Sequence, residues 1–399
     1  MPLTNTHQRY GGVTKTFHWL TALLILTLIG LGLYAEDLPV TTDAELARKA
    51  WVFSLHKTMG VTVFFVALAR ILWAITQPHP RLLNADKRAE SFLASLAHWT
   101  LYGAIVIVPL SGWIGHAAAE GFAPIWWPFG QGLPLVPKDP GVEHLFATIH
   151  VIAGKVLIGT ILLHVAGALK HHVIDRDATL RRMLPGEPVV GPLPPQRHSR
   201  VPALTAALLW VATICIAGAV GLSETEARAE SAPALEQVAS EWQVQEGSIT
   251  ISVHQFGSDV EGSFADWTAD ITFDEDAPGQ TAGSVTATIS IPSLKLGSVT
   301  SQALGADFFA AEDHPTATYR GDILRVADGY EVDGALTIRD QSVPLTLPMD
   351  LSVDGDTADL RAQVTLDRRD WGIGANVGDE KTLGFDVGVD ISLTATRGE

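Results

Sequence analysis

The sequence is poor in sulfur ligands and, in its second half, in catalytic signatures. Cys215 is the only cysteine among 399 residues, so a disulfide within one chain and a metal site built from cysteines are both excluded. After residue 222 the only histidines are His254 and His314, which lack metal-ligand spacing. None of the serines there stands in a nucleophile-elbow context. The second half therefore does not look like an enzyme.

Basic residues are also scarce after residue 222. Residues 1–222 carry 17 Lys and Arg against 12 Asp and Glu, whereas residues 223–399 carry 10 against 32. The net charge of the second part is −22, which argues against nucleic acid as its partner. Such asymmetry indicates two parts of the chain in different environments.

Five stretches are apolar and long enough to cross a bilayer, which takes about 20 residues. They are residues 16–35, 51–76, 95–118, 146–170 and 201–222. The N-terminus and the connections after the second and fourth spans hold 11 Lys and Arg, whereas the other two connections hold three. By the positive-inside rule we expect a bacterial inner-membrane protein with a cytoplasmic N-terminus and residues 223–399 in the periplasm.

The fifth span has two readings. Residues 197–229 also resemble an internal signal sequence, with a basic flank, an apolar run and Ala227-Arg228-Ala229 at its end. Cleavage after Ala229 would release the second half as a separate soluble protein. An uncleaved tether is favoured because internal cleavage sites are unusual, and both readings stay open at this point.

Four histidines fall at membrane depth, where an unpaired imidazole is costly. They are His18, His56, His150 and His164. The last two are 14 residues apart on one predicted helix, about 40° short of four full turns and roughly 21 Å apart along the axis. Depth pairs His18 with His164 and His56 with His150. Two histidines at equal depth on different helices can clamp the iron of a flat macrocycle from both sides.

Other residues could assist such a site. Arg70 should reach the depth of His18 and His164, where it would either partner a heme propionate or extend to the lipid headgroups. His98 could serve a quinone site or a propionate, although packing is favoured. His116 and His144 could be redox-entry residues, although we expect solvated loop histidines. Small residues beside the four histidines would either leave room for a ring or serve close helix packing: Gly60, Ala153, Gly154, Ala166 and Gly167.

The segments around the histidines carry a resemblance. They are Thr16–Leu20 (TFHWL), Ser54–Gly60 (SLHKTMG), Thr148–Gly154 (TIHVIAG) and Leu162–His172 (LLHVAGALKHH). Across residues 8–185 the chain resembles the bacterial cytochrome b561 family. This resemblance implies two heme b groups on the four histidines and electron exchange with membrane quinone. Some members are similar to superoxide oxidases, which pass electrons from superoxide to ubiquinone.

The hydrophobic period changes to two after Glu241. Ile249, Ile251 and Val253 alternate with polar residues, and short strands recur between Gly/Asp turns. This pattern predicts an antiparallel β-barrel or sandwich of about 155 residues. The second half also resembles the YceI family of lipocalin-like, polyisoprenoid-binding proteins, on pieces that include Val253–Gly257 (VHQFG) and Arg368–Ile373 (RRDWGI). The resemblance implies a barrel whose apolar interior accepts an isoprenoid tail such as that of ubiquinone.

The predicted architecture is therefore a multi-domain chain with an all-α membrane part and an all-β barrel. Its parts are a diheme four-helix transmembrane bundle (8–185), a cytoplasmic linker (186–200), a fifth transmembrane helix (201–222), a linker (223–240) and a lipocalin-like barrel (241–397).

We expect a quinone-linked electron-transfer protein whose barrel binds an isoprenoid or quinone. Its expected partners are membrane lipids, ubiquinone or another isoprenoid lipid, and superoxide or a periplasmic electron donor. In one alternative the barrel is the primary, isoprenoid-binding or stress-response module and the cytochrome its anchor. In the other, the chain is a cytochrome subunit of a larger dehydrogenase.

Overall fold

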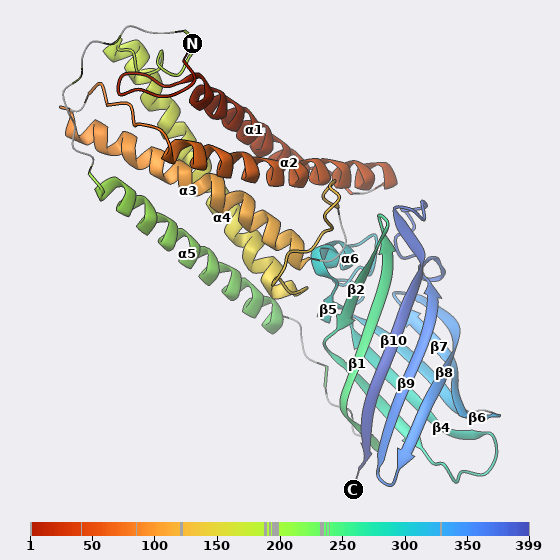
Figure 1. Ribbon diagram of the computed structural model, residues 1–399. Coiled ribbons are helices and arrows are strands. Elements are labelled where there is room, and N and C mark those ends of the chain that lie inside the picture. Colours follow the sequence, from red (N-terminus) through yellow and green to blue (C-terminus); the bar gives the residue numbers. More distant parts are fainter. Residues whose placement is uncertain are drawn as a thin grey trace.

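The N-terminal half of the computed structural model is a bundle of long helices (Figure 1). The structure describes residues 2–40, 42–84, 86–119, 123–186, 190, 193, 199–231, 235–236, 238, 240–327 and 329–398. The helices are α1 (Gly12–Glu36), α2 (Asp43–Ile75), α3 (Arg88–Ala118), α4 (Pro140–Lys170) and α5 (Val201–Ser231). A single π-helical turn, η1 (His171–Asp175), extends α4. All five predicted spans are therefore helical.

Local sequence signals set the starts of α2 and α4. The side chain of Thr42 accepts a hydrogen bond from the backbone N–H of Glu45 at the first turn of α2. Asp139 does the same for Val142 at the start of α4, where Pro140 occupies the first helical position. Such caps satisfy backbone donors that have no partner inside the helix. Both capped ends lie on the side of the bundle that faces the barrel (Figure 1).

The helix α5 packs against α3 and α4. The indole of Trp210 is buried and donates a hydrogen bond to the backbone carbonyl of Thr100 on α3 at 3.1 Å. A Cβ at Gly103 would lie 2.3 Å from Nε1 of Trp210, so only glycine permits this approach. The fifth helix is thus part of the bundle core, together with Ile105, Ala153 and their neighbours.

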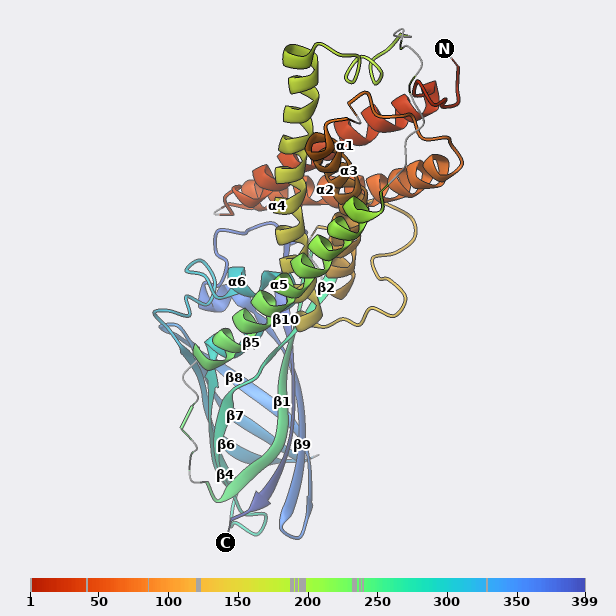
Figure 2. The ribbon, with the colours of Figure 1, turned by 90° about the vertical axis from the view of Figure 1, so that its left-hand side faces the viewer.

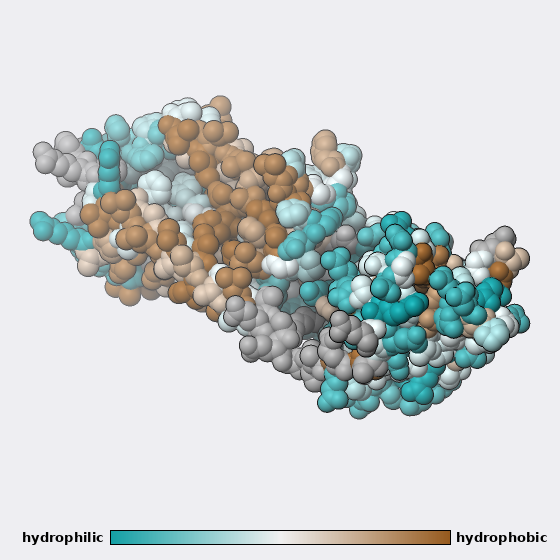
Figure 3. All heavy atoms as spheres, turned by 90° about the horizontal axis from the view of Figure 1, so that it is seen from below, coloured by the Kyte–Doolittle hydropathy of each residue, from teal (hydrophilic) through white to brown (hydrophobic). Residues whose placement is uncertain are grey.

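The outer surface of the bundle is apolar. Leu23, Leu72 and Leu208 each expose more than 60% of their surface. The face in Figure 3 is brown over much of the bundle and mostly teal over the barrel. A broad apolar surface on helices long enough to span a bilayer is the signature of an integral membrane protein.

One boundary differs from the sequence expectation. The fifth helix continues beyond Leu222 to Ser231, so the first residues of the expected linker 223–240 are helical. The expected cleavage motif falls within this helix, and the side chains of residues 224–231 lie outside the described part of the structure. Most of the expected linker 186–200 also lies outside the described residues. The apolar stretch 201–222 indicates where the chain can cross the membrane. It does not indicate that the polar residues after Leu222 continue the same helix.

The C-terminal half forms one antiparallel sheet. Its strands are β1 (Trp242–Gln255), β2 (Ser258–Phe264), β3 (Trp267–Phe273), β4 (Thr281–Ser290), β5 (Leu294–Lys295), β6 (Thr316–Val326), β7 (Gly329–Ile338), β8 (Gln341–Asp354), β9 (Thr357–Asp367) and β10 (Leu383–Arg397). Their order is β3-β4-β6-β7-β8-β9-β10-β1-β2-β5. The sheet curls into the predicted barrel (Figures 1 and 2). Ser240 exchanges hydrogen bonds with the backbone of Ile271 on β3, which ties the chain before β1 to the sheet edge.

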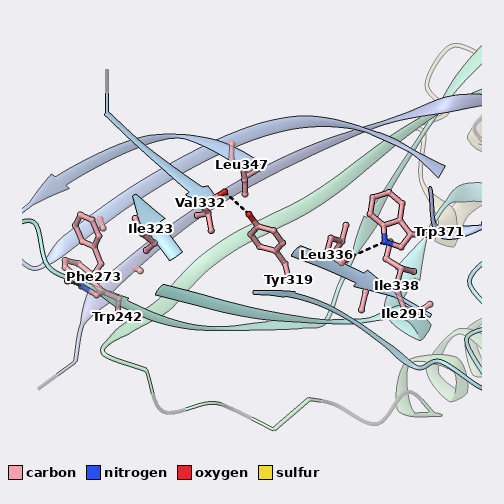
Figure 4. Packing of buried hydrophobic residues seen from close by; sticks show 14 of the residues in the cluster. Trp242, Phe273, Ile291, Tyr319, Ile323, Val332, Leu336, Ile338, Leu347 and Trp371 are labelled. Carbon is pink, nitrogen blue, oxygen red and sulfur yellow. Dashed lines mark hydrogen bonds between the residues drawn. The ribbon is translucent and has the colours of Figure 1, made fainter. Parts of the chain in front are cut away.

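The interior of the barrel is mostly apolar, and two of its large side chains with a polar atom, Tyr319 and Trp371, are bonded to backbone. In Figure 4, Trp242 and Phe273 lie at one end of the core, Tyr319 lies in the middle and Trp371 lies at the other end. The Tyr319 hydroxyl lies 3.0 Å from the carbonyl oxygen of Val332, and the Trp371 indole donates to that of Leu336 at 3.0 Å. These bonds meet the requirement that buried polar groups be paired.

Bundle and barrel meet at the ends where α2 and α4 begin (Figures 1 and 2). Leu46, in the first turns of α2, is fully buried in a cluster with Val377 and Leu383 of the barrel. The short helix η3 (Gly297–Val299) lies against α4. An apolar side chain with no exposed surface fixes one end of the barrel to the end of a membrane helix.

Candidate functional site

Two pairs of histidine rings face each other inside the bundle. His18 on α1 and His164 on α4 have ring centroids 6.2 Å apart, at an interplanar angle of 56°. His56 on α2 and His150 on α4 also have centroids 6.2 Å apart, at 87°. These are the two pairings that depth along the helices predicts. That they bind metal stays a prediction.

The spacing of each pair suits a metal ion. An ion held by an imidazole nitrogen on each side, at about 2 Å from each, would keep the ring centroids roughly 6 Å apart. Rings in direct van der Waals contact would need no such gap. Both pairs of this chain have the spacing that a doubly ligated ion requires.

Hydrogen bonding orients one of these rings. Nδ1 of His150 lies 2.8 Å from the backbone carbonyl of Val108 on α3. A carbonyl accepts only from a protonated nitrogen, so the lone pair of this imidazole lies on Nε2. Metal-binding histidines commonly have their second nitrogen fixed in this way. Nδ1 of His56 is buried and has no hydrogen-bond partner among the described residues.

Two glycines make room for the pair formed by His56 and His150. A Cβ at Gly112 of α3 would lie 2.8 Å from Nδ1 of His150, and one at Gly32 of α1 would lie 3.1 Å from Cε1 of His56. A side chain at Gly112 would therefore force the imidazole to move. Sequence reasoning missed both residues. The signal that could have found them is a glycine inside an apolar span at the depth of a histidine on a neighbouring helix.

The glycines that the sequence suggested, unlike Gly112 and Gly32, do not lie against a histidine ring. A Cβ at Gly60, Gly154 or Gly167 would meet nothing within 4 Å. These positions therefore do not mediate close helix packing within the described structure. They border open space, which is compatible with the room that a flat macrocycle needs.

Arg70 and His98 lie near the pair formed by His18 and His164. The ring centroid of His98 on α3 is 5.0 Å from that of His164, with the rings nearly perpendicular. The Arg70 guanidinium stacks over Tyr102 at 5.5 Å and acts electrostatically on His18 and His164. Arg70 thus reaches the depth expected of it.

The loop between α3 and α4 folds over the barrel-facing end of α2. The ammonium of Lys57 donates to the carbonyl of Ala123 at 3.0 Å, and the Trp126 N–H donates to the Thr58 hydroxyl at 3.0 Å. His116 is buried, with Nε2 2.9 Å from Oε1 of Gln131. The expectation that His116 is a solvated loop histidine is therefore wrong, because α3 extends through it to Ala118.

The opposite end of the bundle holds a network of charged groups. Lys170 lies 2.8 Å from both Glu90 and Asp175, and His171 lies 2.6 Å from Asp177. Glu90, His171 and Asp175 are near enough to share a metal ion. The ammonium groups of Lys87 and Lys170 together neutralise the two carboxylates, so this cluster is better described as an ion-pair network that joins α3 to α4.

The barrel encloses a cavity of about 260 Å³. By the same measure a single water occupies roughly 15 Å³, so the space is of ligand size and is no packing defect. Its lining is apolar apart from a few side chains, and it extends from Ile271 and Ile323 to Leu383 and Trp371. Such a cavity selects an apolar ligand.

Comparison with known proteins divides the chain, as the fold does, into a helical part and a β-sheet part. Residues 9–186 match the model of the prokaryotic cytochrome b561 family, and residues 242–395 match that of the YceI-like domain. Cytochrome b561 homolog 2 of Escherichia coli K12 is 30% identical over 189 residues, which is 46% of this chain and 95% of that protein. The chain belongs to the prokaryotic cytochrome b561 family. Its cytochrome part is joined in the same polypeptide to a YceI-like domain.

Other relatives cover the same parts. A probable superoxide oxidase, CybB of Yersinia pestis, is 24% identical over 180 residues, 45% of this chain and 97% of that protein. Burkholderia cenocepacia BcnA covers 38% of this chain and 96% of its own, with 27% identity and a TM-score of 0.35. The Campylobacter jejuni YceI protein covers 36% and 87%, with 24% identity and a TM-score of 0.32. Membership of the cytochrome b561 family implies that the chain binds heme b.

A first prediction concerns Gly112. In the cytochrome, Gly112→Ala should displace His150, because the added Cβ would lie 2.8 Å from its Nδ1. We expect heme bound per chain, measured by the pyridine haemochrome assay, to fall by about half. Gly159→Ala, which adds the same methyl group on the exposed face of α4 with no atom within 4 Å, is the control and should keep full heme content. Equal heme in the two variants would contradict the proposed contact.

Proposed function

We propose that this chain is a diheme b-type cytochrome that exchanges electrons with a membrane quinone and holds an isoprenoid lipid in its barrel. The observation that carries the proposal is the pair of matched histidine contacts, each 6.2 Å between ring centroids and both sharing α4. Family membership supports heme b. We propose two hemes because the bundle contains two histidine pairs.

In this proposal His18 and His164 hold one heme, and His56 and His150 hold the other. When bound, heme supplies reversible one-electron chemistry. Because two histidines would hold each heme, the protein would leave no further position on the iron for quinone or superoxide, and electrons would pass without a new bond to the metal. The protein's task is then to fix the imidazoles, exclude water and place a charge. Arg70 places a cation beside His18 and His164, suited to a propionate.

A second prediction tests the four ligands. His150→Ala and His56→Ala should each retain about one heme per chain, against two in the unmodified protein. His254→Ala, which changes an exposed barrel histidine, should retain two. The measurement is the pyridine haemochrome assay with a redox difference spectrum on purified protein. Two hemes in His150→Ala would refute its assignment, and fewer than two in the unmodified protein would refute one pair.

We also propose that the N-terminus is cytoplasmic and the barrel periplasmic. The distribution of Lys and Arg supports this orientation, with 11 on one side and three on the other. The ion pairs of Lys170 lie at the basic end, and the barrel lies beyond the other end.

A third prediction follows from this orientation. In a Cys215→Ala background, a membrane-impermeant maleimide added to spheroplasts should label Glu246→Cys on β1. Asp86→Cys, in the connection between α2 and α3, should be labelled only after lysis. Both native residues are exposed, so accessibility to the reagent depends on the side of the membrane. The reverse pattern would invert the proposed topology.

We propose superoxide as the electron donor. The observation that favours it is the similarity to the probable superoxide oxidase of Yersinia pestis across 97% of that protein. The barrel-facing half of the bundle, where Lys57 follows His56 on α2 and His116 lies in the last turn of α3, would receive a periplasmic donor.

A fourth prediction tests donor and acceptor together. An enzymatic flux of superoxide should reduce the heme of the full chain in nanodiscs, and ubiquinone-1 should then reoxidise it. His150→Ala should lower the initial rate of reduction at least tenfold, because it removes a ligand on the side that receives the donor. Superoxide dismutase added in excess is the control and should abolish reduction. Reduction that persists with dismutase would exclude superoxide as the donor.

A further inference from the structure

Two amide groups in the barrel cavity have unused hydrogen-bonding capacity. Gln255 exposes only 4% of its surface, lines the cavity, and its Oε1 has no hydrogen-bond partner among the described residues. Gln302 also lines the cavity, and its buried Nε2 likewise has none. A buried amide without a partner is costly, so each such group in a native fold needs an explanation.

Three other polar side chains of the cavity lining do have partners. Tyr319 and Trp371 bond to backbone carbonyls, as described above. Arg368 is 4% exposed and directs its guanidinium at five backbone carbonyls, among them those of Gly384 and Val377. The unmet capacity is therefore one acceptor on Gln255 and one donor on Gln302.

Both amides lie at the end of the barrel nearest the bundle. Gln255 is the last residue of β1, where it pairs with Leu383 of β10. Gln302 lies on α6 (Thr300–Ala303), which Figure 1 shows between the strands and the helices. Trp242 and Phe273 lie at the opposite end of the core (Figure 4). The cavity thus has two amides with unpartnered atoms at one end, whereas Ile271 and Ile323 line it towards the other.

The chain itself covers the polar end. Leu46 lies in a buried cluster with Leu383, and the partly buried side chains of Val253 and Phe308 pack against this cluster. Leu383, Val253 and Phe308 also line the cavity. The first turns of α2, which leads directly to His56, therefore close the end of the cavity where the two amides lie.

We propose that the barrel binds an isoprenoid whose ring head carries a hydroxyl group, as in a hydroquinone, with the ring towards the bundle. The hydroxyl donates to Oε1 of Gln255 and accepts from Nε2 of Gln302, while the tail extends along the cavity towards Ile271 and Ile323. The first turns of α2 cover the ring. This inference rests on the proposed isoprenoid ligand and adds its orientation, its polar contacts and its cover.

Photocrosslinking of the full chain in nanodiscs tests the orientation. One probe is a ubiquinol analogue with an azide on the ring, and the other carries a diazirine at the end of the tail. We expect the ring probe to label peptides that contain Leu46, Gln255 or Gln302, and the tail probe to label those with Ile271 or Ile323. The reverse pattern would overturn the inference but leave the isoprenoid ligand in place. Labelling of the barrel by neither probe would overturn both, and heme content would report separately on the cytochrome.

Binding measurements test the amides. Gln255→Leu and Gln302→Leu should each weaken binding of ubiquinol-4 at least threefold, because each removes one hydrogen bond to the hydroxyl. Binding of phytane, a branched hydrocarbon without a polar head, should not weaken. Gln243→Leu, an exposed position on the same strand, is the matched control. Equal weakening for both probes would mean damaged packing and would overturn the assignment.

A rate measurement tests the cover. Leu46→Ala should speed the dissociation of ubiquinol-4 severalfold, because a smaller side chain no longer fills the gap between Leu383 and Phe308. Leu33→Ala, an exposed leucine on α1, should leave this rate unchanged. An unchanged rate in Leu46→Ala would show that α2 does not close the cavity.

Discussion

A polar group that is removed from water must find a partner inside the protein, and this constraint governs both halves of the molecule. In the bundle it applies to imidazoles placed in an apolar interior. His150 meets it by bonding the Val108 carbonyl through one nitrogen and facing His56 with its ring. The spacing of the two histidine pairs is compatible with the same need, since a metal ion between each pair would satisfy the remaining lone pairs.

The helix that carries two of these histidines also determines the arrangement of the others. Because His150 and His164 lie on nearly the same face of α4, the helices that carry their partners must pack on that face. Gly112 and Gly32 permit this approach, and α5 closes another side through Trp210 and Gly103. Substitution at one of these glycines would disturb a histidine pair without changing any ligand.

In the barrel the same constraint distinguishes structural polar groups from functional ones. Tyr319, Trp371 and Arg368 bond to backbone and so stabilise the barrel itself. Gln255 and Gln302 each keep one buried polar atom that no described residue satisfies, and the proposed ligand would satisfy both. Leu46 of α2 packs against Leu383 at that end of the barrel, so the barrel and the bundle share one buried junction.

The sequence by itself determined the architecture and the pairing of the histidines. Apolar length marks a membrane helix, alternation marks a strand, and depth along a helix follows from residue number. It could not reveal Gly112, Gly32, Gln255 or Gln302, because their roles depend on which atoms face them from distant elements. Nor could it reveal that Leu46 packs against Leu383, more than 300 residues away. Such contacts were decided only by the tertiary structure, because periodicity indicates which face of an element is buried but not what covers it.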